Sequence, residues 1–334
     1  MDEHGGHPFV SSGFGLATGP SVPSVPTPTP TPNPNPNPAA VSAAATDAAA
    51  DEEIGGPQAI FRVGGYRQGP DGAELTMGVG PWLTGVGATT AVGSLGVLVD
   101  DVLGRPVFMA RPTGSHLVTF ELSVEIVTPP PWSGPLLRAY GTVVDVDAAR
   151  GLSHCEIVDG AGRLVATGRA QLRFVAAGWA QPERTGATTV AGASDLSALD
   201  VLGPAASNGS LASSAAARTS AAAVAAVAGP GDTTGGTRIV VPARPEFGNG
   251  SGAVHGGILF CGVEQAAVAA DDPEGLLRTT SVTVHYLRRA EVDAPVSYDV
   301  VPEHRGRTVA VYKVTARGPA GKPYCVATVA RTAR

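Results

Sequence analysis

The chain has 334 residues, of which 43% are hydrophobic, 16% are charged and 5% are aromatic. This length and composition fit about two domains with a sizeable core. The formal charge of −6 can be assigned to the N-terminal stretch, where six acids precede the first base, Arg62, while the other 23 acids are matched by 23 bases. A near-neutral body with few aromatic side chains lacks the features of nucleic-acid binding, so we expect no nucleic-acid partner.

The cysteines and the hydropathy pattern indicate the compartment. Cys155, Cys261 and Cys325 have no metal-ligand spacing, and an odd number argues against a disulfide framework. The N-terminus has no basic stretch followed by an apolar run, and no uninterrupted apolar stretch reaches the length of a membrane span. We therefore expect a soluble cytoplasmic protein without a membrane partner or a bound metal.

Two segments of biased composition separate the predicted domains. Residues 1–55 include Pro-Thr and Pro-Asn repeats, which favour extended polyproline II structure and cannot form a core. Residues 178–236 are rich in Ala, Ser, Gly and Thr, a composition typical of a flexible linker. We predict a disordered tail, a first domain at 56–177, a linker, and a second domain at 237–334.

The two predicted domains resemble each other. Residues 92–101 parallel residues 255–264 at an offset of 163 residues, and the turn before the last strand of each domain recurs at offsets of 159 to 161. A β-rich stretch, LVTFELSVEI from Leu117, likewise pairs with TSVTVHYL from Thr280. Offsets that agree this closely argue for the duplication of one unit.

Each unit is predicted to contain a short strand, one apolar helix and then a run of antiparallel strands. The helix is apolar on most sides, as expected if a curved sheet wraps around it. Partial alternation and β-branched residues predict four strands after each helix. In the first unit they are 116–127, 136–146, 152–159 and 164–175. In the second unit they are 276–287, 294–302, 308–317 and 324–332.

The most informative motif is NGSGAVHGGILFCGVE, which runs from Asn249 to Glu264. A glycine-rich loop leads into His255, Gly256 and Gly257 and then into an apolar helix. The N-terminus of a helix offers unpaired backbone N–H groups, which suit a developing oxyanion, and glycine lets a substrate approach that backbone closely. Glu264 lies in an otherwise apolar helix, where a carboxylate is costly unless it is paired or used.

These residues resemble a known family. The order Asn-x5-His-Gly-Gly-x6-Glu, followed by a strand that ends in Tyr286-Leu-Arg-Arg and by Arg305-Gly-Arg before the next strand, is similar to the PaaI-like and 4-hydroxybenzoyl-CoA-type hotdog thioesterases. The resemblance covers nearly all of residues 238–334 and, more faintly, about 60–175. It implies an α+β fold of two tandem hotdog domains, packed as a pseudo-dimer behind a disordered tail. Each domain would be a curved antiparallel sheet wrapped around one central helix.

The resemblance also implies a role for each matching residue. Gly256 would use its N–H to polarise the thioester carbonyl at the start of the helix. Asn249 would hydrogen-bond near that carbonyl or fix the loop, and His255 would orient the loop or the thiol leaving group. Glu264 would attack the carbonyl or activate a water. Gln265 follows it at a position where PaaI-type enzymes often carry a threonine.

The implied substrate is an acyl-CoA, so coenzyme A is part of the substrate and no separate cofactor is required. Arginine suits phosphate recognition. Four arginines near strand ends are therefore candidates for the phosphates of coenzyme A, namely Arg288, Arg289, Arg305 and Arg307. Phe260 is a candidate for the lining of an acyl tunnel. A homodimer of such double units is a further expectation.

Helix geometry determines which unit supplies the acid. At a rise of ~1.5 Å per residue, Glu264 lies about 13 Å along the helix from His255 and on roughly the opposite face. One carbonyl cannot contact both, so its carboxylate must come from the antiparallel helix of the other unit. In that unit Asp101 matches Glu264 without a gap, and Asp100 matches it after a slip of one residue.

Two sites are geometrically possible. The first site is composed of residues from both units, namely Asn249, His255, Gly256 and Gly257 with Asp100 or Asp101. The second combines Glu264 with Gly93 and Ser94 of the first unit. It lacks polar groups, because Val92 and Val86 stand where the second unit has its histidine and asparagine. We favour the first site, and the alternative keeps Glu264 active with the Gly93 N–H as the oxyanion donor.

Three functions are compatible with this pattern. Hydrolysis of an acyl-CoA or similar thioester is the leading hypothesis, because an electrophilic carbonyl needs only a carboxylate and one or two N–H donors. A non-catalytic acyl-CoA-binding protein is the alternative, supported by the loss of the histidine and asparagine from the first unit. A hotdog hydratase or dehydratase is third, since its usual Asp-x4-His loop has no convincing counterpart here. Each candidate residue also has a purely structural interpretation, as a packing, capping or solvated residue.

Overall fold

The computed structural model of the chain describes residues 55–69, 72–176, 195–202, 236–271 and 276–334. The predicted disordered tail, apart from Gly55, and most of the predicted linker lie outside these residues. The described elements all belong to one compact unit.

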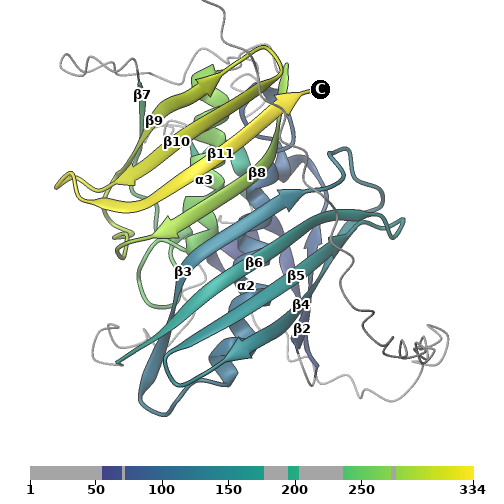
Figure 1. Cartoon of the computed structure of the whole chain (residues 1–334), viewed down its shortest axis with the longest axis vertical. Coiled ribbons are helices and arrows are strands. Elements are labelled where there is room, and N and C mark those ends of the chain that lie inside the picture. Colours follow the sequence, from purple (N-terminus) through teal and green to yellow (C-terminus); the bar gives the residue numbers. More distant parts are fainter. Residues whose placement is uncertain (1–54, 70–71, 177–194, 203–235, 272–275) are drawn as a thin grey trace, which may run out of the picture. The chain divides into compact units, whose positions relative to one another are not determined.

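The strands of the described residues form a single antiparallel sheet in the order β1-β2-β4-β5-β6-β3-β8-β11-β10-β9-β7 (Figure 1). The first half of the sheet contains β1 (Val63–Gln68), β2 (Gly72–Gly78), β3 (Ser115–Ile126), β4 (Leu136–Val146), β5 (Arg150–Val158) and β6 (Leu164–Ala176). The second half contains β7 (Thr237–Val241), β8 (Leu277–Tyr286), β9 (Val296–Arg305), β10 (Val309–Arg317) and β11 (Pro323–Ala333). The eight strands predicted after the two helices all form, with ends displaced by at most three residues.

The two halves of the sheet meet where β3 pairs with β8. Figure 1 shows these two strands side by side in the middle of the sheet. Their register pairs Ser123 with Thr283 and, on either side, Glu121 with His285 and Glu125 with Ser281. A pseudo-two-fold axis therefore passes between Ser123 and Thr283, at an offset of 160 residues that agrees with the sequence repeat.

Two long apolar helices lie behind the sheet, α2 (Leu95–Met109) and α3 (Gly256–Asp271) (Figure 1). They pack so closely that a Cβ atom on Gly257 would lie 2.4 Å from Cα of Val97. Farther along α3, Glu264 approaches Gly93, which precedes α2, and a Cβ on Gly93 would lie 2.8 Å from Cβ of Glu264. Because later residues of one helix meet earlier residues of the other, the helices run antiparallel.

Several short helices complete the described residues. They are α1 (Gly56–Phe61), η1 (Pro81–Leu83), η2 (Val86–Ala88), η3 (Val92–Ser94), η6 (Ala198–Val201) and η8 (Pro245–Phe247). Among the described helices, none combines the length and the apolarity required to cross a membrane.

The start of the first half differs from the sequence-based expectation of a single short strand before the helix. It contains α1 and two strands, β1 and β2, that pair as a hairpin. The Gly64-Gly65 pair interrupts any alternating pattern in β1, so pairing with β2 rather than local propensity holds this strand in place. In α1, Ile60 and Phe61 are fully buried and anchor the helix in the core.

Part of the predicted flexible linker is packed. Within it, η6 begins with a capping box in which Ser197 and Asp200 satisfy each other's backbone N–H groups. Ala198, Val201 and Leu202 are buried in the core. The sequence did not indicate this apolar cluster, because residues 178–236 are otherwise rich in Ala and Ser.

Replacing Gly257 by alanine tests the helix contact. The added methyl group would meet the backbone of Val97, which cannot rotate away, so we expect Gly257→Ala to lower the free energy of unfolding by about 3 kcal/mol. Gly104→Ala in α2 is the matched control, because its Cβ would lie 4.0 Å from the nearest atom, on Leu172. This variant should raise the free energy of unfolding by about 1 kcal/mol, since alanine favours a helix more than glycine does. Urea denaturation measures both changes, and equal effects of the two variants would contradict the close packing.

Candidate active site

The candidate site lies where the start of α3 meets the middle of α2. We call it the Asp100 centre and define it by Asp100 and Asp101 of α2, Thr119 of β3, and His255, Gly256 and Gly257 of the second half. The side chains of Asp100, Asp101 and His255 retain 14%, 19% and 8% of their exposed surface. Both halves of the chain therefore contribute to one partly accessible polar cluster in an apolar surround.

The ring of His255 bridges the start of α3 and the two aspartates. Its Nδ1 accepts a hydrogen bond from the Gly257 N–H at 3.0 Å and lies 3.6 Å from Asp100 Oδ2. Its Nε2 lies 3.3 Å from Asp101 Oδ1. Because Nδ1 is an acceptor, the neutral ring carries its proton on Nε2 and donates it to Asp101. Burial lowers the pKa of His255, but the hydrogen bond with Asp101 and the charges of both aspartates outweigh it and raise the pKa above its usual value.

Both oxygens of Asp101 are engaged. Oδ1 faces His255 Nε2, and Oδ2 accepts a hydrogen bond of 2.9 Å from the amide of Gln58 in α1. The carboxylate thus joins two donors that lie 3.4 Å apart. Its contacts suit a group that orients its neighbours.

Asp100 has one anchored oxygen and one that faces the start of α3. Oδ1 accepts a hydrogen bond of 2.8 Å from the Thr119 hydroxyl. Oδ2 lies so near Gly256 that a Cβ on that glycine would be 2.7 Å from it. Burial raises the pKa of Asp100, and the charge of Asp101 raises it further, while His255, Thr119 and the Gly257 N–H act in the opposite direction. The net effect is a more basic carboxylate beside the helix terminus.

Two further residues hold the loop before α3 and its first turn. The Asn249 side chain accepts hydrogen bonds from the Ser251 N–H at 3.0 Å and from the Ala253 N–H at 3.1 Å. These bonds connect the Asn249 side chain to the backbone of the loop that leads into α3. The Tyr286 hydroxyl of β8 donates to the Gly256 carbonyl at 2.8 Å. In the sequence, Tyr286 was noted only as part of the family motif, without a role at the site.

The pseudo-symmetric position holds a second buried acid. We call it the Glu264 centre and define it by Glu264, Gln265, Thr279 and Gly93. Glu264 accepts hydrogen bonds from Thr279 at 2.7 Å and from Gln265 at 2.5 Å. Burial raises the pKa of Glu264, while these two hydrogen bonds, the nearby charge of Arg331 and the Gly93 N–H act in the opposite direction without cancelling it.

The Glu264 centre is closed by its own side chains. Glu264 and Gln265 retain 2% and 1% of their exposed surface. Gln265 also accepts a hydrogen bond of 2.6 Å from the Val86 N–H, and it occupies the space beside Gly85. Ser94, expected at this site, is fully buried and donates to the Ala91 carbonyl instead. Among the described residues, these side chains fill the space around the acid.

Each centre contains a strand threonine that the sequence analysis did not identify. Thr119 and Thr279 lie 160 residues apart, the offset of the pseudo-two-fold axis, and each donates to the helix acid of its own half. By this contact Asp100 is the counterpart of Glu264, although a gapless alignment selects Asp101. The repeat offset between the strands could have identified these two threonines. No sequence signal pointed to Gln58 in α1.

The other predicted ligand-binding residues are dispersed. Arg288 and Arg289 follow β8 at the Tyr286 end of the sheet, where they donate to the carbonyls of Pro323 and Ser251. Arg305 ends β9, and Arg307 lies in the turn before β10. Both are at the edge of the second half-sheet at which β8 begins. They are thus nearer to the Glu264 centre. Phe260 is buried and packs on Gly96 of α2. Within the described residues, no group of three or more His, Cys, Asp and Glu side chains has the arrangement of a metal site.

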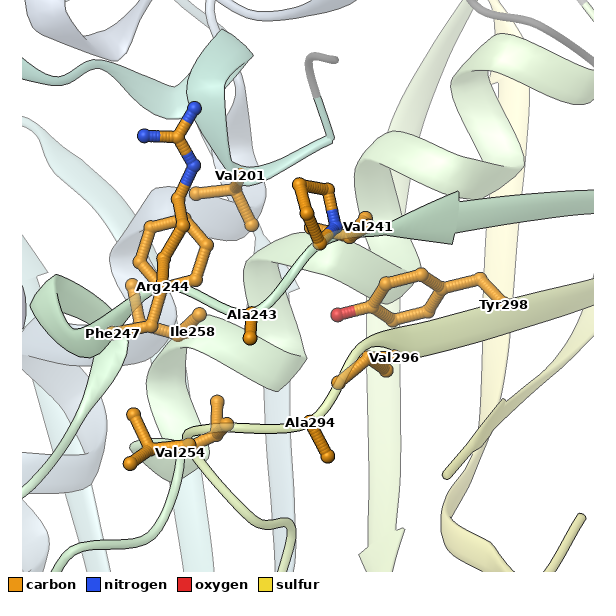
Figure 2. A pocket seen from close by; sticks show the side chains of 12 residues that line it. Val201, Val241, Ala243, Arg244, Phe247, Val254, Ile258, Ala294, Val296 and Tyr298 are labelled. Carbon is orange, nitrogen blue, oxygen red and sulfur yellow. The ribbon is translucent and has the colours of Figure 1, made fainter. Parts of the chain in front are cut away.

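An apolar pocket lies on another side of α3 (Figure 2). Val201 of η6 and Phe247 of η8 line it together with Ile258 and Tyr298. Figure 2 shows these side chains converging from the packed linker segment, the loop before α3 and β9. The packed part of the linker therefore completes an apolar wall of the second half.

Comparisons with known proteins agree with this architecture. Residues 243–332 match the family model described as the acyl-CoA thioesterase N-terminal domain. Among curated proteins, none matches the chain by sequence.

Solved structures of similar fold cover about four fifths of the chain. A protein assigned as a thioesterase from Novosphingobium aromaticivorans is 17% identical with a TM-score of 0.52, covering 80% of this chain and 98% of its own. The 12:0-ACP thioesterase from Umbellularia californica is 10% identical with a TM-score of 0.52, covering 78% and 94%. The tesB protein of Mycobacterium avium subspecies paratuberculosis is 10% identical with a TM-score of 0.50, covering 81% and 96%.

The fold is therefore that of the hotdog proteins, as expected, with an antiparallel sheet packed on central helices. Within it, residues 243–332 are the part of the chain that is similar to the acyl-CoA thioesterase family. The PaaI-like and 4-hydroxybenzoyl-CoA-type subtype stays a prediction.

Gln265 tests whether the Glu264 centre is structural. Gln265→Ala would leave the partly buried Val86 N–H and one oxygen of Glu264 without these partners and would open a cavity, so we expect a loss of about 2–4 kcal/mol in unfolding free energy. Gln68→Ala, at an exposed position on β1, should change it by less than about 0.5 kcal/mol. Chemical denaturation measures both, and an unchanged stability of Gln265→Ala would contradict this interpretation.

Proposed function

We propose that the protein hydrolyses an acyl-CoA or a related acyl thioester at the Asp100 centre. The observation that carries this proposal is the position of Asp100 Oδ2 beside Gly256, at the N-terminus of the antiparallel helix of the other half. The match of residues 243–332 to the acyl-CoA thioesterase family supports the reaction class.

The substrate carbonyl binds at the start of α3. As the first residue of the helix, Gly256 has an N–H without an intrahelical partner, and this group donates to the carbonyl oxygen. The absence of a side chain on Gly256 leaves room beside Asp100, because a Cβ there would collide with the carboxylate. The N–H and the helix dipole then stabilise the oxyanion that develops during attack.

Asp100 acts as the general base. Its Oδ2 accepts a proton from a water as the water oxygen attacks the carbonyl carbon, and its raised pKa brings the base closer to neutral pH. The tetrahedral intermediate collapses with cleavage of the C–S bond. The proton returns from Asp100 to the thiolate, which leaves as the thiol, and the acyl group leaves as the carboxylic acid.

Asp100 is preferred over the other two acids because of its contacts. Asp101 has both oxygens engaged by Gln58 and His255, and Glu264 is enclosed by Gln265 and Thr279. Asp100 alone of the three combines partial exposure with an oxygen directed at the start of the opposite helix. Arg288 and Arg289, at the same end of the sheet, are the better placed candidates for the phosphates of coenzyme A.

Paired substitutions test the choice of acid. Asp100→Asn removes the base, so we expect kcat/KM to fall at least about 100-fold. Glu264→Gln keeps the shape of a side chain that serves only packing, and kcat/KM should stay within about threefold once corrected for the folded fraction. Thiol release is followed with acyl-CoA esters of short, medium, long and aromatic acyl groups. Absence of turnover by the folded wild type on all of them would refute the proposal, and the reverse ranking of the two variants would move the site to Glu264.

The pH profile tests the coupling of the two aspartates. Burial and the charge of Asp101 both raise the pKa of Asp100, so the acidic limb of kcat/KM should lie above the usual carboxyl range. Asp101→Asn removes that charge, so the limb should move to lower pH while the maximal rate declines. Initial rates measured across the pH range for both proteins check this sign, and a limb that stays in place or moves upward would contradict it.

A further inference from the structure

A short helix from the start of the first half reaches the candidate site. The Gln58 amide of α1 donates to Asp101 Oδ2 at 2.9 Å and lies 3.4 Å from His255 Nε2. Asp101 belongs to the first half and His255 to the second, so Gln58 contacts one group from each. No feature of the sequence singled out this residue.

The position of Gln58 is fixed by the packing of α1. Ile60 and Phe61, one helical turn away, are fully buried. At the other end, Gly56 has a φ of +61°, and a Cβ there would lie 3.0 Å from the Gly248 carbonyl in the loop that leads to His255. The helix is therefore held against the core on one side and against the loop of the second half on the other.

The hydrogen bonds around the imidazole form one ordered chain. Gln58 donates to Asp101, Asp101 accepts from His255 Nε2, and His255 Nδ1 accepts from the Gly257 N–H. Because the Gly257 N–H faces Nδ1, the neutral ring carries its proton on Nε2, and the chain selects this tautomer and ring orientation. Without the amide, Asp101 Oδ2 loses a partner and the carboxylate is free to turn away from the ring.

We propose that Gln58 is a positioning residue which, through Asp101, holds His255 in the Nε2–H tautomer and so fixes the first turn of α3 against Asp100. This inference rests on the proposed function and adds a residue to its site. Gln58 contacts Asp101 and the imidazole and acts on the reaction through them. Its removal should lower kcat and leave KM nearly unchanged.

The charges around the imidazole define the expected response to pH. Asp100 and Asp101 of α2 face the ring, Tyr286 of β8 faces Asp100, and the neutral amide of Gln58 completes the surround. A carboxylate at position 58 would add a third negative charge to this group. It would disfavour ionisation of the aspartates and favour the charged imidazole.

Two substitutions separate positioning from packing. Gln58→Met keeps the length of the side chain and removes the donor, and we expect kcat to fall about tenfold with KM within about twofold. Gln58→Glu should move the acidic limb of kcat/KM to higher pH. Gln68→Met, an exposed glutamine on β1, is the matched control and should retain the wild-type rate and profile.

Histidine 15N NMR gives a readout that does not depend on turnover. The His255 signals, assigned with His255→Ala, should show the Nε2–H tautomer in the wild type and a raised pKa of His255 in Gln58→Glu. If the wild type hydrolyses no thioester, the proposed function fails while this test of Gln58 stands. If Gln58→Met does not fold, Gln58→Glu carries the test. An unchanged His255 titration together with an unchanged pH profile in Gln58→Glu would overturn the proposal.

Discussion

The antiparallel contact between α2 and α3 is the constraint on which the rest of this structure depends. Gly257 brings the first turn of α3 against the backbone of Val97, and Gly93 allows the corresponding approach at the other centre. At this separation, the acids in the middle of each helix reach the N-terminus of the other. A single helix could not place a carboxylate and its own N-terminal N–H groups on one carbonyl, because they lie about 13 Å apart on roughly opposite faces. Duplication of the unit within one chain supplies the second helix.

Duplication also allowed the two centres to diverge. Both retain a helix acid, a strand threonine that donates to it, and a glycine N–H from the opposite half. In the Glu264 centre the remaining space is filled by Gln265, and every polar group contributes to an internal network. Such a network stabilises a core when it is fully satisfied. In the Asp100 centre, the histidine, the glycine pair and the shorter acid leave one carboxylate oxygen directed at a helix terminus.

Much of the fold was predictable from sequence, because the strands carry alternating β-branched patterns and because the repeat offsets align the two units. The antiparallel pairing of the helices was expected from helix geometry together with the residue roles that the family resemblance implies. Three features could not be predicted. Gln58 lies on a six-residue helix that shows no periodicity and forms because Ile60 and Phe61 are buried. The packed segment around Val201 could not be recognised because the sequence on both sides of it is rich in Ala and Ser. The choice between Asp100 and Asp101 depends on which one reaches Thr119, and this contact selects Asp100 although a gapless alignment selects Asp101.

The most direct test of the central claim is a crystal structure of the protein with a ketone analogue of an acyl-CoA, in which a methylene group separates the sulfur from the carbonyl. We expect the ketone oxygen to accept a hydrogen bond from the Gly256 N–H, with Asp100 Oδ2 within reach of a water beside the carbonyl carbon. A ketone bound instead between Gly93 and Glu264 would contradict it.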